Sequence, residues 1–165
     1  MSIAKEDLFA LSLVEGVGAT SIQNILNAEI SISDFDEETL SQHIKGPKKA
    51  VGINAIITNF SQYQEQAEHQ INELESSDIH LICCTDSEYP SLYRNIAKPP
   101  IFLYARGNLE LLNYEKNIAI IGTRQCSPFG KDIAKKTAKR FVEAGYNIVS
   151  GLALGIDTAA HEGAL

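Results

Sequence analysis

The stretch from residue 117 to residue 165 constrains the fold of this chain more than any other. It holds two short apolar runs, at 118–121 and 147–150, and each precedes a glycine-bearing loop and a helical pattern. Short β-branched runs of this kind are typical of strands covered on both faces of a parallel sheet. The order strand, helix, strand predicts a parallel pair joined by a right-handed crossover. Both loops should then emerge at the carboxyl edge of the sheet, where open α/β sheets bind ligands.

The two helices of this stretch are expected to begin near Gly130 and around Asp157. Gly145 should end the first one, because glycine readily adopts the left-handed conformation that closes a helix. The apolar stripe of that helix is predicted from spacing to comprise Ile133, Thr137, Phe141 and Val142.

The first 76 residues predict a small all-helical domain. We expect a helix up to Val14, a second one capped by Thr20 or Ser21, a third over 36–44, and one long helix or two abutting ones up to about Ser76. The turn 16–18 (Gly-Val-Gly) is similar to that of a helix-hairpin-helix unit, which can present N–H groups to a DNA phosphate. We favour a purely structural turn here, because the segment is acidic and no lysine or arginine lies near the hairpin.

Residues 77–165 predict a second domain of the α/β class. Two further strands are expected at 79–84 and 101–104, so that the sheet has at least four strands. The last helical pattern has only begun at Leu165 and no strand follows it. A sheet that ended there would expose a large apolar edge, and we therefore expect the chain to be part of a longer protein.

The net charge of −7 conceals an uneven distribution. Residues 1–88 carry 4 basic and 15 acidic side chains, whereas residues 89–165 carry 10 basic and 6 acidic ones. The positive excess falls in the part with the glycine loops, so a polyanionic partner remains open. No apolar run is long enough to span a membrane, and the three cysteines form neither a disulfide framework nor a metal-binding spacing. A reducing cytoplasm is the expected location.

The two loops together predict an anion site. Their glycines (Gly122, Gly130, Gly151 and Gly155) allow the backbone to approach a ligand closely. The two helix N-termini offer N–H groups and a positive dipole end. Arg124 supplies a guanidinium fork for phosphate oxygens, and hydroxyl donors come from Thr123, Ser127 and Ser150.

Common nucleotide sites fit the pattern poorly. No G-x-G-x-x-G follows either strand, and no G-x-x-x-x-G-K-[ST] occurs. Catalysis also has little support. Asp157 and His161 lie one helical turn apart, but a helix cap and a packed side chain are the simpler roles for them. Cys126 has Arg124 nearby, yet no histidine base beside it in sequence.

Five motifs, in order, carry a family resemblance over about residues 86–165. They are Tyr-Pro-x-Leu (89–92), Pro-Pro-x-x-Leu-Tyr-x-x-Gly (99–107), Ile-Ile-Gly-Thr-Arg (120–124), Ser-Gly-Leu-Ala-x-Gly-Ile-Asp (150–157) and Ala-His-x-Gly-Ala-Leu (160–165). This set resembles the DprA/Smf family of DNA-processing proteins. The helical region before it is similar to the N-terminal SAM-like domain that many members carry. The resemblance implies a helical domain at 1–76 and the first part of an extended Rossmann-like domain at 77–165.

The same resemblance implies a function. Family members bind single-stranded DNA, protect it during natural transformation, form homodimers and help to load the RecA recombinase. They use no cofactor or metal for this, and catalysis is not expected. Arg124 would be the chief phosphate contact, in a pocket lined by Gly122, Thr123, Ser150, Gly151 and Gly155. Whether this stretch of chain alone binds DNA or dimerises stays open.

Two other classes of function remain possible. Related α/β folds hydrolyse nucleotide phosphoribosyl bonds, with a carboxylate poised by a glycine-rich loop, and Asp157 and Glu162 are the candidates here. Alternatively, the acidic helical domain makes the chain a protein-interaction module.

Overall fold

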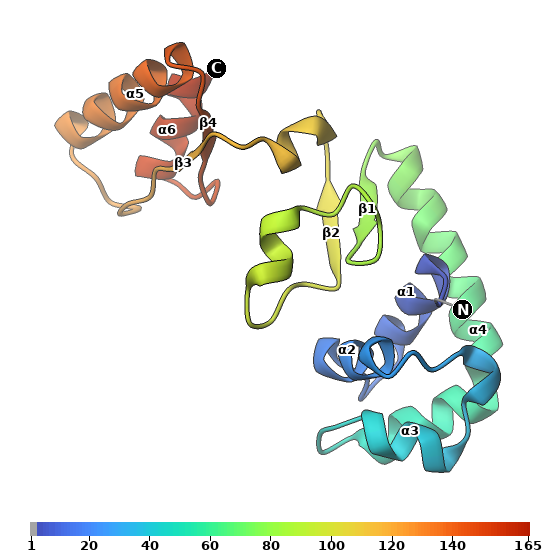
Figure 1. Ribbon diagram of the computed structural model, residues 1–165. Coiled ribbons are helices and arrows are strands. Elements are labelled where there is room, and N and C mark those ends of the chain that lie inside the picture. The colour runs from blue at the N-terminus through green and yellow to red at the C-terminus, as the bar shows by residue number, and fades with distance from the viewer. Residues whose placement is uncertain (1–2) are drawn as a thin grey trace. The chain divides into compact units, whose positions relative to one another are not determined.

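A computed structural model describes residues 3–165 of the chain, which form two compact units that divide between residues 109 and 110 (Figure 1). The first unit contains four α-helices, a pair of strands and short 3₁₀ turns. Its elements are α1 (Lys5–Leu13), α2 (Ala19–Asn27), η1 (Ile32–Asp34), α3 (Glu37–His43), α4 (Lys49–Ser76), β1 (His80–Cys83), η2 (Ser91–Asn95) and β2 (Phe102–Ala105).

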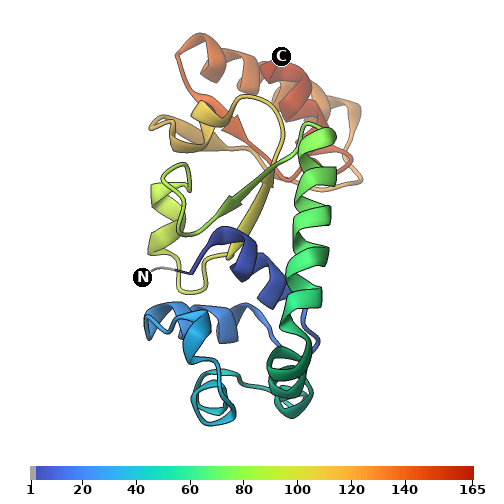
Figure 2. The same ribbon diagram turned by 90° about the vertical axis from the view of Figure 1, so that its right-hand side faces the viewer.

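The helices of the first unit enclose two apolar clusters. Both ribbon views show α1 lying against the long helix α4 (Figures 1 and 2). Leu8 and Leu11 of α1 and Ile22 and Ile25 of α2 are fully or almost fully buried in the larger cluster. Both predicted alternatives, one long helix or two abutting ones, describe part of α4. The helix runs from Lys49 to Ser76, but Asn59 breaks its helical backbone (φ −137°, ψ 20°). The predicted helical organisation of this region is confirmed.

Helix starts follow local capping chemistry, with one correction. The carboxylate of Asp36 accepts a hydrogen bond from the backbone N–H of Thr39 at 2.7 Å and begins α3 as predicted. The prediction that Thr20 or Ser21 caps α2 is wrong, because Gly18 is the cap residue. Ser21 is instead buried inside the helix, where its hydroxyl accepts a hydrogen bond from the backbone N–H of Lys45 at 3.1 Å.

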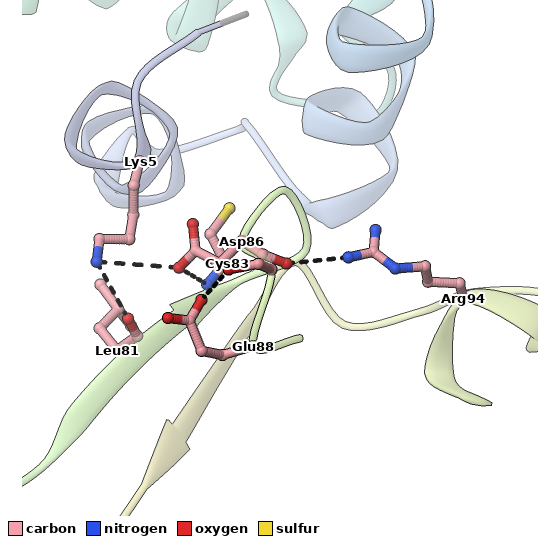
Figure 3. A network of polar contacts seen from close by, with 7 residues as sticks. Lys5, Leu81, Cys83, Asp86, Glu88 and Arg94 are labelled. Carbon is pink, nitrogen blue, oxygen red and sulfur yellow. Dashed lines mark hydrogen bonds and ion pairs between the residues drawn. The ribbon is translucent and has the colours of Figure 1, made fainter. Parts of the chain in front are cut away.

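Strands β1 and β2 pair antiparallel, with His80 opposite Ala105 and Cys83 opposite Phe102. They belong to the core of the helical unit, since the ring of Phe102 meets that of Phe9 edge to face at 5.4 Å. Figure 3 shows how Lys5 of α1 joins this pair: its ammonium donates to the carbonyl of Leu81 at 3.4 Å and lies 3.9 Å from the Asp86 carboxylate. The contacts thus group β1 and β2 with the helices, while the predicted domain boundary after residue 76 stays a prediction.

The second unit contains η3 (Leu109–Asn113) at its border, then β3 (Asn117–Ala119), α5 (Pro128–Glu143), β4 (Asn147–Val149) and α6 (Ile156–Ala164). Strands β3 and β4 are parallel, and Ile118 lies opposite Ile148. The predicted parallel pair with a helical crossover is therefore confirmed. The prediction of a single sheet of at least four strands is wrong for residues 3–165, where the strands form two separate pairs. Gly107, with φ of 103°, and then η3 turn the chain between β2 and β3.

Helices α5 and α6 pack closely in the second unit (Figure 1). The predicted apolar stripe of α5 is only partly correct. Ala134 and Ala138 are buried, whereas Ile133 and Val142 are substantially exposed. The reason is steric, because small side chains let the helix backbones approach. A methyl group added at Gly163 of α6 would meet the carbonyl oxygen of Lys135 and lie 2.9 Å from its Cα.

The β3–β4 pair is covered on one side only within the described residues. Ile148 is buried together with Ala138 and Ala160 of the helices. Ile121 and Val149 are exposed, so the expectation of strands covered on both faces is not met in this part of the chain.

Candidate functional site

The loops that follow β3 and β4 lie at one edge of the parallel pair, because parallel strands end on the same side. Hydrogen bonds connect the two loops where they begin. The N–H of Ile120 donates to the carbonyl of Val149 at 3.0 Å, and the hydroxyl of Ser150 donates to the carbonyl of Ile120 at 2.6 Å. The hydroxyl proton of Ser150 therefore holds the two loops together.

Further along, the two loops touch through their backbones at glycines. Gly155 has φ of 95°, and a methyl group there would meet the carbonyl oxygen of Thr123 and lie 2.6 Å from that of Arg124. A methyl group at Gly122 would lie 2.7–2.9 Å from three carbons of the Ile156 side chain. These positions need glycine for close packing between loops, in addition to any close approach by a ligand.

The helix N-termini at this edge are largely satisfied from within the chain. The hydroxyl of Ser127 caps α5 by accepting from the N–H of Gly130 at 3.1 Å, so this helix begins at Pro128, slightly before the predicted start. At α6, the N–H of Ile156 donates to the carbonyl of Thr123 at 3.3 Å. Fewer N–H groups are therefore left for an anion than the sequence predicts, and more of the attraction must come from side chains.

Arg124 is the side chain suited to that role. It is exposed, and its guanidinium has no carboxylate partner among residues 3–165. No acidic residue occurs in the segment 117–131. By contrast, Lys135 and Lys136 on α5 are paired with Glu162 at 3.3 Å and Asp132 at 2.7 Å. An unpaired guanidinium on an exposed loop retains its full capacity to bind an anion in two-point fashion.

Asp157 has a structural position that the sequence did not indicate. It is only 7% exposed, and its carboxylate accepts a hydrogen bond from the backbone N–H of Gly151 at 3.1 Å. The expectation that it caps α6 is wrong, because Gly155 is the cap residue and Asp157 lies in the first helical turn. Its carboxylate ties the start of the β4–α6 loop to the helix that ends this loop.

The other candidate catalytic groups are not assembled into a site. No ion pair joins Asp157 and His161 among the residues described, and Nε2 of His161 is buried without a hydrogen-bond partner in this part of the chain. Glu162 is paired with Lys135. The described residues contain no group of three or more histidine, cysteine, aspartate or glutamate side chains able to hold a metal ion. Within the same residues, no helix has both the length and the apolar character that crossing a membrane requires.

Every residue of the predicted anion site lies in this pair of loops or at the helix starts beside them. Gly122, Thr123, Arg124, Ser127 and Gly130 come from the β3–α5 side, and Ser150, Gly151 and Gly155 from the β4–α6 side. Their assignment to ligand binding stays a prediction. Sequence reasoning missed Leu152, an exposed residue with a left-handed backbone (φ 54°). Nothing in the sequence indicates this, because leucine is not a residue that favours this conformation.

Comparison with known proteins identifies the family to which the chain is similar. A family model described as "DNA recombination-mediator protein A" matches residues 80–165. The DNA processing protein DprA of Bacillus subtilis is 31% identical over 107 residues, which cover 65% of this chain and 36% of that protein. DprA of Streptococcus pneumoniae is 44% identical over 80 residues, which cover 48% of this chain and 28% of that protein. Protein Smf of Escherichia coli is 33% identical over 92 residues, or 56% of this chain and 24% of that protein.

A solved structure is also similar over nearly the whole chain. The X-ray structure of DNA processing protein A from Streptococcus pneumoniae aligns with a TM-score of 0.72 and 28% identity. The alignment covers 99% of this chain and 54% of that one. The chain thus spans about a third or less of the length of these curated relatives.

Proposed function

Because this chain belongs to the DNA recombination-mediator protein A family, which includes the DprA and Smf proteins, we propose that the protein binds single-stranded DNA at the β3–α5 and β4–α6 loops. One observation carries this proposal. Arg124 is an exposed, unpaired guanidinium in an acid-free segment at the carboxyl edge of a parallel strand pair. This is the place where α/β folds bind ligands, and the phosphate is the group that a guanidinium fork recognises best.

The groups beside Arg124 suit phosphate contacts that do not depend on the base sequence of the strand. Backbone and hydroxyl contacts to phosphates position a strand but carry no sequence information. The hydroxyls of Thr123 and Ser150 donate to the carbonyls of Gln125 and Ile120 in this structure, so each must turn from its carbonyl to donate to a phosphate oxygen. Gly122, Gly151 and Gly155 let the two loops and the start of α6 pack closely, which fixes the backbone that carries Arg124. Ser127 and Gly130 shape the start of α5 beside it.

Arg124→Ala in the full-length protein tests the proposal, with Arg140→Ala as the matched control. Arg140 is also exposed but lies in the last turn of α5. Loss of a hydrogen-bonded charge contact is worth about 1.5–3 kcal/mol, and therefore Arg124→Ala should weaken binding of a dT oligonucleotide roughly 10- to 150-fold. The slope of log K against log[salt] should fall by about 0.7, the value for one phosphate contact on a single strand. Fluorescence anisotropy over a salt series measures both quantities.

Arg124→Lys separates charge from geometry in the same assay. Lysine keeps the charge but lacks the planar fork, so this variant should recover the salt slope and only part of the affinity. If Arg124→Ala binds the oligonucleotide as well as the parent and Arg140→Ala do, the proposed site is wrong.

The proposal extends to the recombinase partner. A recombination mediator must hand its strand to a recombinase, and we expect the full-length protein to promote RecA assembly on single-stranded DNA and to act as a homodimer. RecA ATPase activity on DNA coated with a single-strand-binding protein measures the first, and sedimentation measures the second. Arg124→Ala should lose the stimulation in parallel with its loss of DNA affinity. Stimulation that survives in a variant unable to bind DNA would contradict this order of events.

A further inference from the structure

Four large apolar side chains at the two loops are exposed to an unusual degree. They are Ile121 (76%), Phe129 (74%), Leu152 (80%) and Leu154 (77%). Among the large apolar side chains that the structure describes, only Leu165 at the end of the chain is more exposed. Scattered surface leucines are ordinary, but four at one edge of a small unit indicate a surface that contacts an apolar partner.

The backbone holds one of these side chains outward under strain. Leu152 has φ of 54°, a conformation that residues with a bulky side chain rarely adopt. The loop is fixed just before it, where the N–H of Gly151 donates to the buried carboxylate of Asp157 and the hydroxyl of Ser150 to the carbonyl of Ile120. Strained backbone persists where surrounding contacts impose it, and such residues cluster at functional sites.

The exposed apolar side chains lie in the same two loops as Arg124 or at the start of α5. Leu154 precedes Gly155, whose Cα packs against the backbone of Arg124. Phe129 lies at the start of α5, in the segment that follows Arg124. The loop segments 117–131 and 150–156 contain no acidic residue. These segments thus combine exposed apolar side chains with the unpaired guanidinium of Arg124 and contain no negative charge.

We infer that Phe129, Leu152 and Leu154 contact the unstacked bases of the strand whose phosphates Arg124 binds, an inference that rests on the proposed function. An unpaired nucleic-acid strand combines flat apolar faces with a row of negative charges, which matches this surface in both respects. Aromatic and apolar side chains beside a cationic groove are how proteins hold single strands without reading sequence. A second copy of the chain docked symmetrically on these loops would bring two Arg124 side chains together, and like charges disfavour that arrangement.

The test compares two ligands that share a phosphate backbone and differ in bases. The full-length protein is titrated with a dT oligonucleotide and with an abasic strand of equal length. The parent should bind the dT strand more tightly. Phe129→Ala and Leu152→Asn should each weaken dT binding by about fivefold or more, in line with stacking losses at single-strand sites, and leave abasic binding and the salt slope unchanged. Asparagine is chosen at position 152 because it tolerates a left-handed backbone.

Two further variants complete the design. Val142→Ala removes an apolar side chain from α5 outside these loops and should bind both strands like the parent. The chain contains no tryptophan, so Phe129→Trp places a fluorescent ring at the site. Its emission should be quenched by the dT strand and not by the abasic strand.

The outcomes separate the inference from the proposed function. Equal affinity of the parent for the dT strand and the abasic strand overturns the base contacts. An equal loss of affinity for the two strands in Phe129→Ala and Leu152→Asn does so too. Either result holds against the inference even where Arg124→Ala weakens binding of both strands. The same holds if these side chains are covered by another part of the protein, since the two variants then bind both strands like the parent. If Arg124→Ala affects neither strand, the proposed function fails and the inference falls with it.

Discussion

Gly155→Ala is the substitution that tests the loop contact at the candidate site most directly. Gly155 combines a positive φ of 95° with a ψ of −123°, close to backbone geometry that only glycine adopts readily. It also lies against Thr123 and Arg124 of the neighbouring loop, so that an added methyl group would be 2.6 Å from the Arg124 carbonyl oxygen and 2.8 Å from its Cα. Both partner atoms belong to backbone, which cannot rotate away as a side chain does.

The expected cost has two parts. Backbone strain of this kind costs about 1–3 kcal/mol. Forcing a methyl group into a packed contact costs about 1–3 kcal/mol more. We therefore expect Gly155→Ala to lower the free energy of opening of the second unit by about 2–6 kcal/mol. At 1.36 kcal/mol per tenfold, this corresponds to amide exchange at least about 30-fold faster.

Two other glycines of the same unit allow the cost of backbone strain and the cost of the packing contact to be measured separately. Gly145 has φ of 81° but no atom within 4 Å of an added methyl group, so Gly145→Ala measures strain alone. Gly163 lies inside α6 without a positive φ, and its methyl group would meet the backbone of Lys135, so Gly163→Ala measures packing alone. Hydrogen–deuterium exchange of peptides from residues 117–165, read by mass spectrometry, reports the opening of this unit in the full-length protein.

Gly155→Ala should open the unit more than either control does. It should also weaken binding to single-stranded DNA, because the displaced backbone carries Arg124. Exchange no faster than in Gly145→Ala would refute the close loop-to-loop contact and, with it, the reasoning that glycine is needed here for packing.

Three further predictions concern single hydrogen bonds. Ser127→Ala removes the hydroxyl cap of α5 and should destabilise the second unit by about 1 kcal/mol, measured by the same exchange experiment, with Ser127→Asp retaining the cap. The N–H of Thr39 holds the pKa of Asp36 below its usual value, so the cap of α3 should be intact above that usual value and lost as the pH falls through the lowered pKa. Asp36→Asn should abolish this acid dependence in thermal unfolding followed by circular dichroism. A hydrogen bond from the thiol of Cys84 lowers the pKa of Cys83 against the effect of burial, so Cys84→Ala should raise that pKa in an ultraviolet thiolate titration.

Local signals predicted much of the secondary structure. The glycine that ends α5 and the short β-branched runs each act within a few residues, so they can be read directly from the sequence. The order of elements was likewise enough to predict a parallel pair with its loops at one edge, and the five motifs were enough to indicate the DprA/Smf family.

What failed depended on distant partners. The apolar stripe predicted for α5 consisted mainly of bulky residues. Because α6 packs closely against α5, the residues buried on α5 are the small Ala134 and Ala138. The position of Ser21 inside the core depends on a hydrogen bond to Lys45, 24 residues away. Pairing of β1 with β2 inside the helical unit depends on packing of Phe102 against Phe9, which no local pattern records.

The sequence by itself determined the element order, the glycine loops and the presence of Arg124 between them, because these follow from residue type and short spacing. Only the tertiary structure decided that Gly155 packs on Arg124, that Asp157 secures its loop, and that Leu152 is held outward in a strained conformation. The first of these depends on contact between segments well separated in the chain, and the second on a hydrogen bond across a whole loop. Such contacts are fixed by packing and by the pairing of buried polar groups, whose partners a linear pattern does not specify.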